Sequence, residues 1–235
     1  MNFHLLFEQS GTFKNVLKQN NYNAFDYDIL NDFNETDYII DIFNEIELEY
    51  LNILNGYKTE TIFSKMNQNN DFIIAFFPCT HFSGLNEFQY KLLIRGKRRA
   101  LNKESIQRII NRNNERAKFF ELYMKFCFIV THKKIPTIIE NPASSSGNHS
   151  YLELFSPIPI SYKETNRQKW GDYFRKPTIF LSINFEMNEK QIPQTPCLKE
   201  EKKSILIKTF GMKQRSMISK TYAENFYKRF LEGRI

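Results

Sequence analysis

The segment DFIIAFFPCTHFS, residues 71–83, starts with an unbroken apolar run and then stops at a proline and a cysteine. A short apolar run of this kind is typical of a strand that is buried on both faces of a parallel sheet. Pro78 has no backbone N–H to donate to a strand ladder, so we expect the strand to end there. The segment therefore predicts a core strand with Cys79 at its carboxyl end.

Segments with the pattern of strands alternate along the chain with segments whose apolar residues recur every three or four positions. The predicted strands are FHLLFE (3–8), NAFDYDI (23–29), YIIDIF (38–43), DFIIAFF (71–77) and PTIIEN (136–141). The predicted helices are GTFKNVLKQNN (11–21), EIELEYLNILNGY (45–57) and most of 104–132. This alternation predicts an α/β fold with a doubly wound, mostly parallel sheet. Ligands of such sheets bind beyond the carboxyl ends of the strands.

The composition narrows the class of protein. With 235 residues, of which 41% are hydrophobic, the chain is long enough for one domain with a substantial core. No apolar run approaches the roughly 18 residues of a membrane-spanning helix, and the first residues lack the pattern of a secretory signal. Cys79, Cys127 and Cys197 are too scattered for a disulfide framework or a CxxC metal site. We expect a reduced, cytoplasmic protein with no metal and no membrane partner.

Charge is distributed unevenly along the chain. Residues 1–83 carry 4 basic and 12 acidic residues, whereas residues 84–134 carry 13 basic and 4 acidic residues. The second segment includes IRGKRR (94–99) and several basic residues of the predicted long helix. It fits either a solvated helix face, which explains most charge runs, or a surface that meets a polyanion.

Five short motifs carry a resemblance to a known family. They are LLFEQSGTF (5–13), YDI (27–29), IDI (40–42), FPCTHFS (77–83) and IENP (139–142). In this order and at this spacing they resemble the motifs of cytosine-C5 DNA methyltransferases. GDYFRKPT (171–178) and RSMISKTYAENF (215–226) are similar to segments of short phage-borne DNA-methylase-like proteins. The resemblance covers most of 3–142 and implies a methyltransferase-like domain over 1–235, with the sheet type of S-adenosylmethionine-dependent methyltransferases.

The resemblance implies a site for S-adenosylmethionine at the ends of the first strands. The residues themselves agree: Gly11 would let a ligand carboxylate approach the backbone N–H groups at the start of the first helix. Asp28 ends the second strand, where an acid can accept hydrogen bonds from ribose hydroxyls, although Asp28 and Asp41 also fit ordinary strand-end carboxylates. The family has glycine where this chain has Gln9 and Thr12. By the resemblance, the cofactor-binding residues are Phe7, Gly11, Thr12, Phe13, Asp28, Asp41, Ile42 and Pro78.

Cys79 and Glu140 fit covalent catalysis at a cytosine ring. Carbon-5 of cytosine is a poor nucleophile, and addition of a thiolate to C6 makes C5 able to accept a methyl group. An acid beside N3 accommodates the developing charge, and burial of Glu140 can keep it protonated for that task. A buried cysteine that only fills the core is the alternative, and the presence of Glu140 favours the nucleophile.

DNA, duplex or single-stranded, is the partner that the resemblance implies. In the family a mobile loop after the cysteine closes over DNA, and here the basic loop and helix segment at 84–134 takes that place. RQKWGDYFRKPT (167–178) stands where the family has a Gln-x-Arg-x-Arg motif, so Arg167 is a candidate for its contacts. Trp170, Tyr173 and Phe174 fit either base stacking or the core. The expected nucleic-acid-binding residues are Arg95, Lys97, Arg98, Arg99, Arg175 and Lys176.

The last part of the chain predicts an exposed loop at 188–203 and a C-terminal helix at 219–232 with Ser219 as its N-cap. It is too short for the full target-recognition domain of the family. The leading hypothesis is DNA cytosine-C5 methylation, in the cytoplasm of a bacterial host if the chain is phage-encoded. The alternatives are an inactive methyltransferase-like phage protein that binds nucleic acid or a host defence protein, and an enzyme for free pyrimidine nucleotides.

Overall fold

A computed structural model describes the chain except for residues 92, 95–96, 99–101, 145–148 and 197–216, and gives only the backbone of 85, 88, 93–94 and 97–98. The described strands are β1 (Asn2–Leu6), β2 (Asn23–Asp28), β3 (Tyr38–Ile39), β4 (Asp71–Phe76), β5 (Leu93–Ile94), β6 (Lys97–Arg98), β7 (Thr137–Pro142), β8 (Ile160–Glu164) and β9 (Thr178–Ile183). The described helices are α1 (Thr12–Gln19), α2 (Ile42–Asn55), α3 (Lys103–His132), α4 (Tyr151–Phe155) and α7 (Lys220–Phe226). Three short turns accompany them, the 3-10 turns η1 (Gly84–Tyr90) and η2 (Arg167–Trp170) and the π-helical turn η3 (Tyr227–Leu231).

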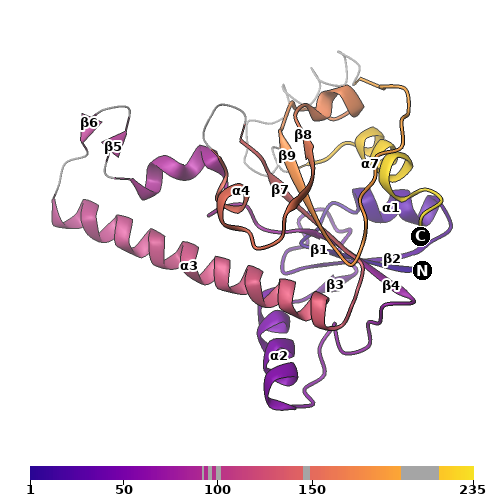
Figure 1. The fold of residues 1–235 in the computed structure, drawn as a ribbon, viewed down its shortest axis with the longest axis horizontal. Coiled ribbons are helices and arrows are strands. Elements are labelled where there is room, and N and C mark those ends of the chain that lie inside the picture. The colour runs from indigo at the N-terminus through magenta and orange to yellow at the C-terminus, as the bar shows by residue number, and fades with distance from the viewer. Residues whose placement is uncertain (92, 95–96, 99–101, 145–148, 197–216) are drawn as a thin grey trace.

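The main sheet has seven strands in the order β3-β2-β1-β4-β7-β9-β8. The neighbouring pairs from β3 to β7 are parallel, and β9 runs antiparallel to both β7 and β8. Helices α1, α2 and α3 lie between consecutive parallel strands in the sequence, as a parallel sheet requires. The prediction of an α/β fold with a mostly parallel sheet is confirmed (Figure 1).

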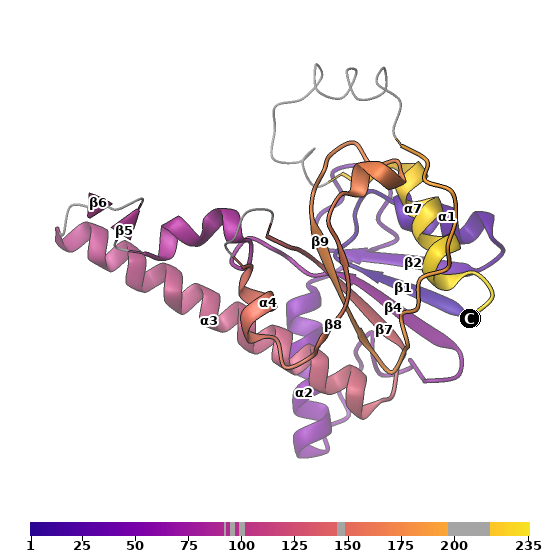
Figure 2. The same ribbon diagram turned by 45° about the horizontal axis from the view of Figure 1, so that its top comes forward.

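The side chains of β4 show how both faces of the sheet are covered. Phe72 and Ile74 are buried in the cluster that includes α1 and α7, while Ile73 and Ala75 are buried in the cluster of α2 and α3. Figures 1 and 2 show α1 and α7 together on one side of the sheet, with α2 and α3 on the other. Successive strand residues point to opposite faces, and burial of one such large apolar side chain contributes roughly 1.5–3 kcal/mol. The apolar run therefore forms a strand, β4, that is buried on both faces, and Phe77 follows its end.

The third strand is shorter than its sequence predicts. Only Tyr38 and Ile39 pair with β2, and α2 begins at Ile42, inside the segment that was predicted to be strand. Asp41 ends the strand because its carboxylate Oδ1 accepts the backbone N–H of Phe43 at 3.0 Å, which makes Asp41 the N-cap of α2.

The C-terminal helix begins as predicted. Ser219 is its N-cap, and its hydroxyl accepts the backbone N–H of Tyr222 at 3.0 Å. The helix continues into η3 and packs beside α1 (Figure 2). Residues 188–196 form no regular element, as predicted for an exposed loop, and 197–203 lie outside the described residues. Trp170 belongs to the core, where the Arg229 guanidinium lies 3.8 Å from the centre of its ring.

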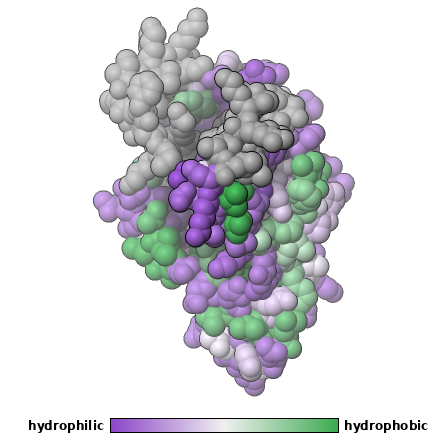
Figure 3. Space-filling model, turned by 90° about the vertical axis from the view of Figure 1, so that its left-hand side faces the viewer, coloured by the Kyte–Doolittle hydropathy of each residue, from purple (hydrophilic) through white to green (hydrophobic). Residues whose placement is uncertain are grey.

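Strands β5 and β6 form a separate antiparallel pair that projects away from the main sheet with the first part of α3 (Figures 1 and 2). Figure 3 views the molecule from the side on which this arm projects and shows hydrophilic residues with several hydrophobic groups between them. The exposed basic residues at the start of α3 include Lys103 and Arg108. Within the described part of the chain, no helix has both the length and the apolar character to cross a bilayer.

Candidate functional site

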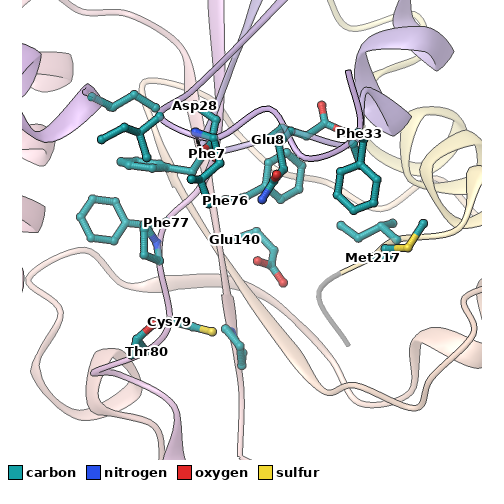
Figure 4. A pocket seen from close by; sticks show the side chains of 18 of the residues that line it. Phe7, Glu8, Asp28, Phe33, Phe76, Phe77, Cys79, Thr80, Glu140 and Met217 are labelled. Carbon is teal, nitrogen blue, oxygen red and sulfur yellow. Dashed lines mark hydrogen bonds between the residues drawn. The ribbon is translucent and has the colours of Figure 1, made fainter. Parts of the chain in front are cut away.

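A cavity of about 650 Å³ lies at the carboxyl ends of β1, β2, β4 and β7. This volume is in the usual range for small-molecule sites. Of the residues predicted for catalysis and cofactor binding, those that line it are Phe7, Asp28, Asp41, Ile42, Pro78, Cys79 and Glu140. Further lining residues are Glu8, Thr80 and, from the segment before α7, Met217 and Ile218. Figure 4 shows Cys79 and Glu140 in one part of the cavity and Phe7, Glu8 and Asp28 in another.

Strand register brings Cys79 and Glu140 to the same cavity. Phe76, the last residue of β4, pairs directly with Glu140 of β7. The chain then turns at Pro78, where the carbonyl of Cys79 accepts backbone N–H groups from Phe82 at 3.0 Å and from Ser83 at 2.9 Å. Two parallel neighbours end at the same edge of a sheet, so a residue just past β4 and a residue near the end of β7 face one space.

Asn141 fixes the turn that carries the cysteine. Its side-chain amide donates a 2.8 Å hydrogen bond to the carbonyl of Phe77, across 64 positions of sequence. Its Oδ1 is buried and has no hydrogen-bond partner among the described residues. Asn141 therefore links β7 to the peptide just before Pro78. Sequence reasoning noted Asn141 only as part of the IENP motif and assigned it no role.

The environment of Cys79 sets the reactivity of its thiol. Burial raises the pKa of the thiol, the nearby Lys176 opposes the rise, and the charge of Glu140 adds to it. A thiol with a raised pKa is mostly protonated at neutral pH, so Cys79 needs a base or a bound substrate to become a nucleophile.

We expect alkylation to distinguish Cys79 from Cys127. Cys79 is partly accessible, whereas Cys127 is 4% exposed and burial raises its pKa to about 12. With iodoacetamide under native conditions, Cys79 should react more slowly than a peptide thiol near neutral pH and accelerate as the pH rises, while Cys127 stays protected. Mass spectrometry of the two peptides measures both rates. Equal labelling of the two cysteines in folded protein would contradict this assignment.

Two cations face the carboxylate of Glu140. The guanidinium of Arg167 lies 3.4 Å from Glu140 Oε1, and the ammonium of Lys176 lies 4.0 Å from the same oxygen. Arg167 is 1% exposed, and its Nε lies 2.6 Å from a carboxylate oxygen of Asp172. These charges offset the cost of burying a carboxylate. The resemblance suggested contacts with DNA for Arg167 and Lys176. The structure places both beside Glu140, and of the two only Lys176 is among the described residues that line the cavity.

The first strands contribute Phe7 and Asp28 to the other end of the cavity. Phe7 has a positive φ of 61°, its N–H donates to the carbonyl of Tyr27 at 2.9 Å, and its ring packs on Phe43 and Phe77. Burial raises the pKa of the Asp28 carboxyl, although Oδ1 accepts the backbone N–H of Leu30 at 2.8 Å. A strained aromatic residue and an acid at adjacent strand ends fit a site for a nucleoside.

The turn between β1 and α1 does not leave the space for a ligand carboxylate that was expected there. Gly11 has a φ of 64°, and a Cβ at this position would lie 2.9 Å from the Glu35 carboxylate, so the chain itself fills the space that a ligand was expected to use. The backbone N–H of Phe13 donates to Glu8 Oε1 at 2.9 Å. Thr12 accepts a hydrogen bond from Ser10. The described residues that line the cavity do not include Gly11, Thr12 or Phe13, which were expected to bind the cofactor.

The predicted nucleic-acid-binding residues lie apart from one another. Arg175 is exposed, next to Lys176 at the cavity. Lys97 and Arg98 belong to β6, of which only the backbone is described, and Arg95 and Arg99 lie outside the described residues. Arg116, from the same basic segment, pairs with Glu87 at 2.6 Å and is held between the rings of two tyrosines. Arg116 therefore stabilises the fold.

Comparison with models of protein families and with curated proteins finds no match to this chain. Across the described ranges, no group of three histidine, cysteine or acidic side chains is placed to hold a metal ion. The functional interpretation therefore depends on the geometry of the cavity.

Proposed function

We propose that the protein transfers a methyl group from S-adenosylmethionine to C5 of cytosine in DNA through a covalent adduct with Cys79. The observation that carries this proposal is the position of Cys79 and Glu140, which come from neighbouring strand ends and line one cavity together with Asp28. The cavity holds a thiol, a carboxyl group and an acid that can accept hydrogen bonds from ribose hydroxyls. These match the three parts of the reaction: the nucleophile, the partner of N3 and the cofactor site.

The topology of the sheet supports the same proposal. The sheet is mostly parallel, with β9 antiparallel between β7 and β8, and is compatible with the sheet that the resemblance implies. The fold class alone does not determine function, because one architecture hosts many chemistries. The topology therefore supports the cofactor, and the cavity supports the reaction.

In the proposed reaction the thiol of Cys79 loses its proton to solvent, its sulfur forms a bond to C6 of the cytosine, and the C5–C6 double bond opens so that C5 gains electron density. Glu140 would be the hydrogen-bonding partner of N3 as charge develops there. When C5 takes the methyl group, the sulfonium donor would leave as a neutral thioether. Loss of the C5 proton to water then restores the C5–C6 double bond and releases the thiolate of Cys79 from C6. Lys176 favours the thiolate form of Cys79 through its positive charge.

The cavity fits the adenosine part of S-adenosylmethionine better than its amino-acid part. Asp28 and Phe7 would hold the ribose and the adenine, with Ile42 as an apolar wall. The cofactor would supply the methyl group as a positively charged sulfonium. Its amino-acid carboxylate finds no free backbone donor at Phe13, because Glu8 already accepts that N–H.

Asp28→Ala should weaken the binding of S-adenosylmethionine at least tenfold, or about 1.4 kcal/mol, because a buried acceptor for the ribose hydroxyls is lost. Calorimetry measures the affinity. Asp32→Ala is the control, since Asp32 is exposed and is not among the described lining residues. Unchanged affinity in Asp28→Ala would remove Asp28 from the cofactor site.

A transfer assay tests the function directly. The protein is incubated with S-adenosylmethionine labelled in its methyl group and with sequence-diverse single- and double-stranded DNA, and the nucleosides are then analysed by mass spectrometry. We expect labelled 5-methylcytosine, and none when the DNA contains 5-methylcytosine in place of cytosine. A protein that binds both cofactor and DNA but transfers no methyl group to any member of the pool would reject the proposal.

The second candidate is a methyltransferase-like protein without turnover, which binds nucleic acid or a host defence protein. Two observations favour it: the raised pKa of the Cys79 thiol and the carboxylate of Glu8 at the start of α1. It predicts DNA or protein binding that does not change with S-adenosylmethionine. The transfer assay separates it from the enzyme.

A further inference from the structure

We propose that the nucleoside end of the cavity binds a ligand without a carboxylate more tightly than one that carries it, because Glu8 replaces the ligand carboxylate at the start of α1. This inference rests on the proposed function in one respect, that the ligand contains adenosine. It concerns the chemical group attached at the 5′ position of that nucleoside.

Glu8 is built into the start of α1 as an internal carboxylate. Its side chain is 6% exposed, and its Oε1 accepts the N–H of Phe13 at 2.9 Å and the hydroxyl of Ser10 at 3.2 Å. Its Oε2 is buried without a hydrogen-bond partner among the described residues. The N-terminus of a helix attracts anions, and here that attraction is already used by a residue of the chain.

The loop after β2 covers the same turn from outside. The backbone N–H of Asp32 donates to the side-chain oxygen of Gln9 at 3.2 Å, and the carboxylate of Glu35 lies over Gly11. Lys14, the nearest cation of α1, is buried and pairs with Asp26 at 3.0 Å and with Asp37 at 3.2 Å. A ligand carboxylate would therefore reach neither the helix start nor this lysine.

The charges on the wall of the cavity act in the same direction. Among its described lining residues, the carboxyl groups are those of Glu8, Asp28, Asp41 and Glu140, and the basic side chain is Lys176. Lys176 lies beside Glu140 and acts on Cys79. In Figure 4, Cys79 lies away from Phe7 and Glu8. A carboxylate near the nucleoside end would meet like charges in a partly enclosed site, where Coulomb interactions are weakly screened.

The ionisation of Glu8 provides a second, independent test of this inference. Burial raises the pKa of its carboxyl to about 7, and Asp26 on β2 adds to this rise, while the hydrogen bond from Phe13 opposes it. Glu8 is therefore mostly charged at about pH 8 and mostly neutral at about pH 6. Any penalty for a ligand carboxylate should decrease as the pH falls through this range.

Calorimetry with two nucleosides and one control ligand tests the inference. S-adenosylhomocysteine carries an α-carboxylate and an α-ammonium group, and 5′-methylthioadenosine lacks both. Decarboxylated S-adenosylhomocysteine, which keeps only the ammonium group, is the control for that positive charge. At about pH 8 we expect 5′-methylthioadenosine to bind at least about tenfold more tightly. At about pH 6 the affinity for S-adenosylhomocysteine should rise several-fold, and that for 5′-methylthioadenosine should stay nearly constant.

Glu8→Gln retains an oxygen that accepts the N–H of Phe13 and removes the charge, so it should bring the two affinities within about threefold of each other. Glu35→Gln is the matched control, since it removes one charge from the covering loop outside the cavity lining and should preserve the difference. If S-adenosylhomocysteine binds as tightly as 5′-methylthioadenosine to wild type at about pH 8, the inference is overturned and the nucleoside site stands. If neither ligand binds, both the inference and the proposed cofactor site are rejected.

Discussion

Cys79→Ser should abolish the covalent trapping of the protein on DNA that contains 5-fluorocytosine. In wild type, the sulfur adds to C6 and C5 accepts the methyl group. Fluorine at C5 then blocks the elimination that would release the enzyme, so the bond between sulfur and C6 persists. A serine hydroxyl is far less ionised than a thiol near neutral pH, so no adduct should form. Trapping should also require S-adenosylmethionine.

Denaturing electrophoresis of the protein with a pool of fluorocytosine-containing oligonucleotides, single- and double-stranded, measures the adduct. Cys127→Ser is the matched control, because Cys127 lies on the buried face of α3, in the core, and should not affect trapping in the folded fraction. Glu140→Gln should slow adduct formation strongly while DNA binding is retained. Cofactor binding should survive in Cys79→Ser. An adduct in Cys79→Ser, or none in wild type that binds both cofactor and DNA, would identify Cys79 as a packing residue.

Arg167→Leu should lower the free energy of unfolding by about 3–5 kcal/mol, because it leaves buried carboxylates without their cation. Arg167 is 1% exposed and lies between Glu140 and Asp172, which are themselves 6% and 1% exposed. Its guanidinium also lies 4.3 Å from the centre of the Tyr222 ring, so the change affects the contact with α7. Denaturant unfolding followed by circular dichroism measures the effect.

The same loop supplies the control for this prediction. Arg175→Leu removes an exposed arginine eight positions later and should change the stability by about 0.5 kcal/mol or less. Adding Asp172→Asn to Arg167→Leu should recover part of the loss, since the asparagine oxygen still accepts the N–H groups of Tyr173 and Ser219 without a charge. A loss below about 1 kcal/mol in Arg167→Leu would show that water reaches this ion pair.

The sequence by itself determined several of the elements and the edge of the sheet at which the cavity lies. Apolar runs and helical spacing are local properties, and they identified β1, β2, β4, β7, α1 and the long helix α3 with small differences at the ends. Because parallel strands share one carboxyl edge, residues that follow separate strands, such as Cys79 and Asp28, were expected to converge. Both line the same cavity.

Local signals were less informative where a cap competes with a strand. The segment at 38–43 has the apolar content of a strand, but Asp41 caps α2 in the middle of it. A side-chain oxygen that accepts backbone N–H groups is as strong a signal as apolar content over so few residues. Asp41 was expected among the cofactor-binding residues, and its Oδ1 accepts backbone N–H groups at the start of α2 instead.

Only the tertiary structure decided which charges surround the site. Arg167 meets Glu140 across 27 positions of sequence, and Asn141 reaches the carbonyl of Phe77 across 64. The insertion of β9 antiparallel beside β7 is likewise a pairing between distant segments. Hydrogen bonds and ion pairs of this kind depend on which segments are neighbours in space, and no local pattern of residues specifies that.

The turn after β1 shows that a local pattern of residues is insufficient even for segments that are near each other in the sequence. The sequence places a glycine where a ligand carboxylate would approach α1, and the fold fills that place with Glu8 and Glu35. Burying Glu8 is costly unless its oxygens find donors, and the free N–H groups at the start of α1 provide them. The sequence therefore determined that a polar site lies beyond β1, and the packing of the loop after β2 decided which anion occupies the start of the helix.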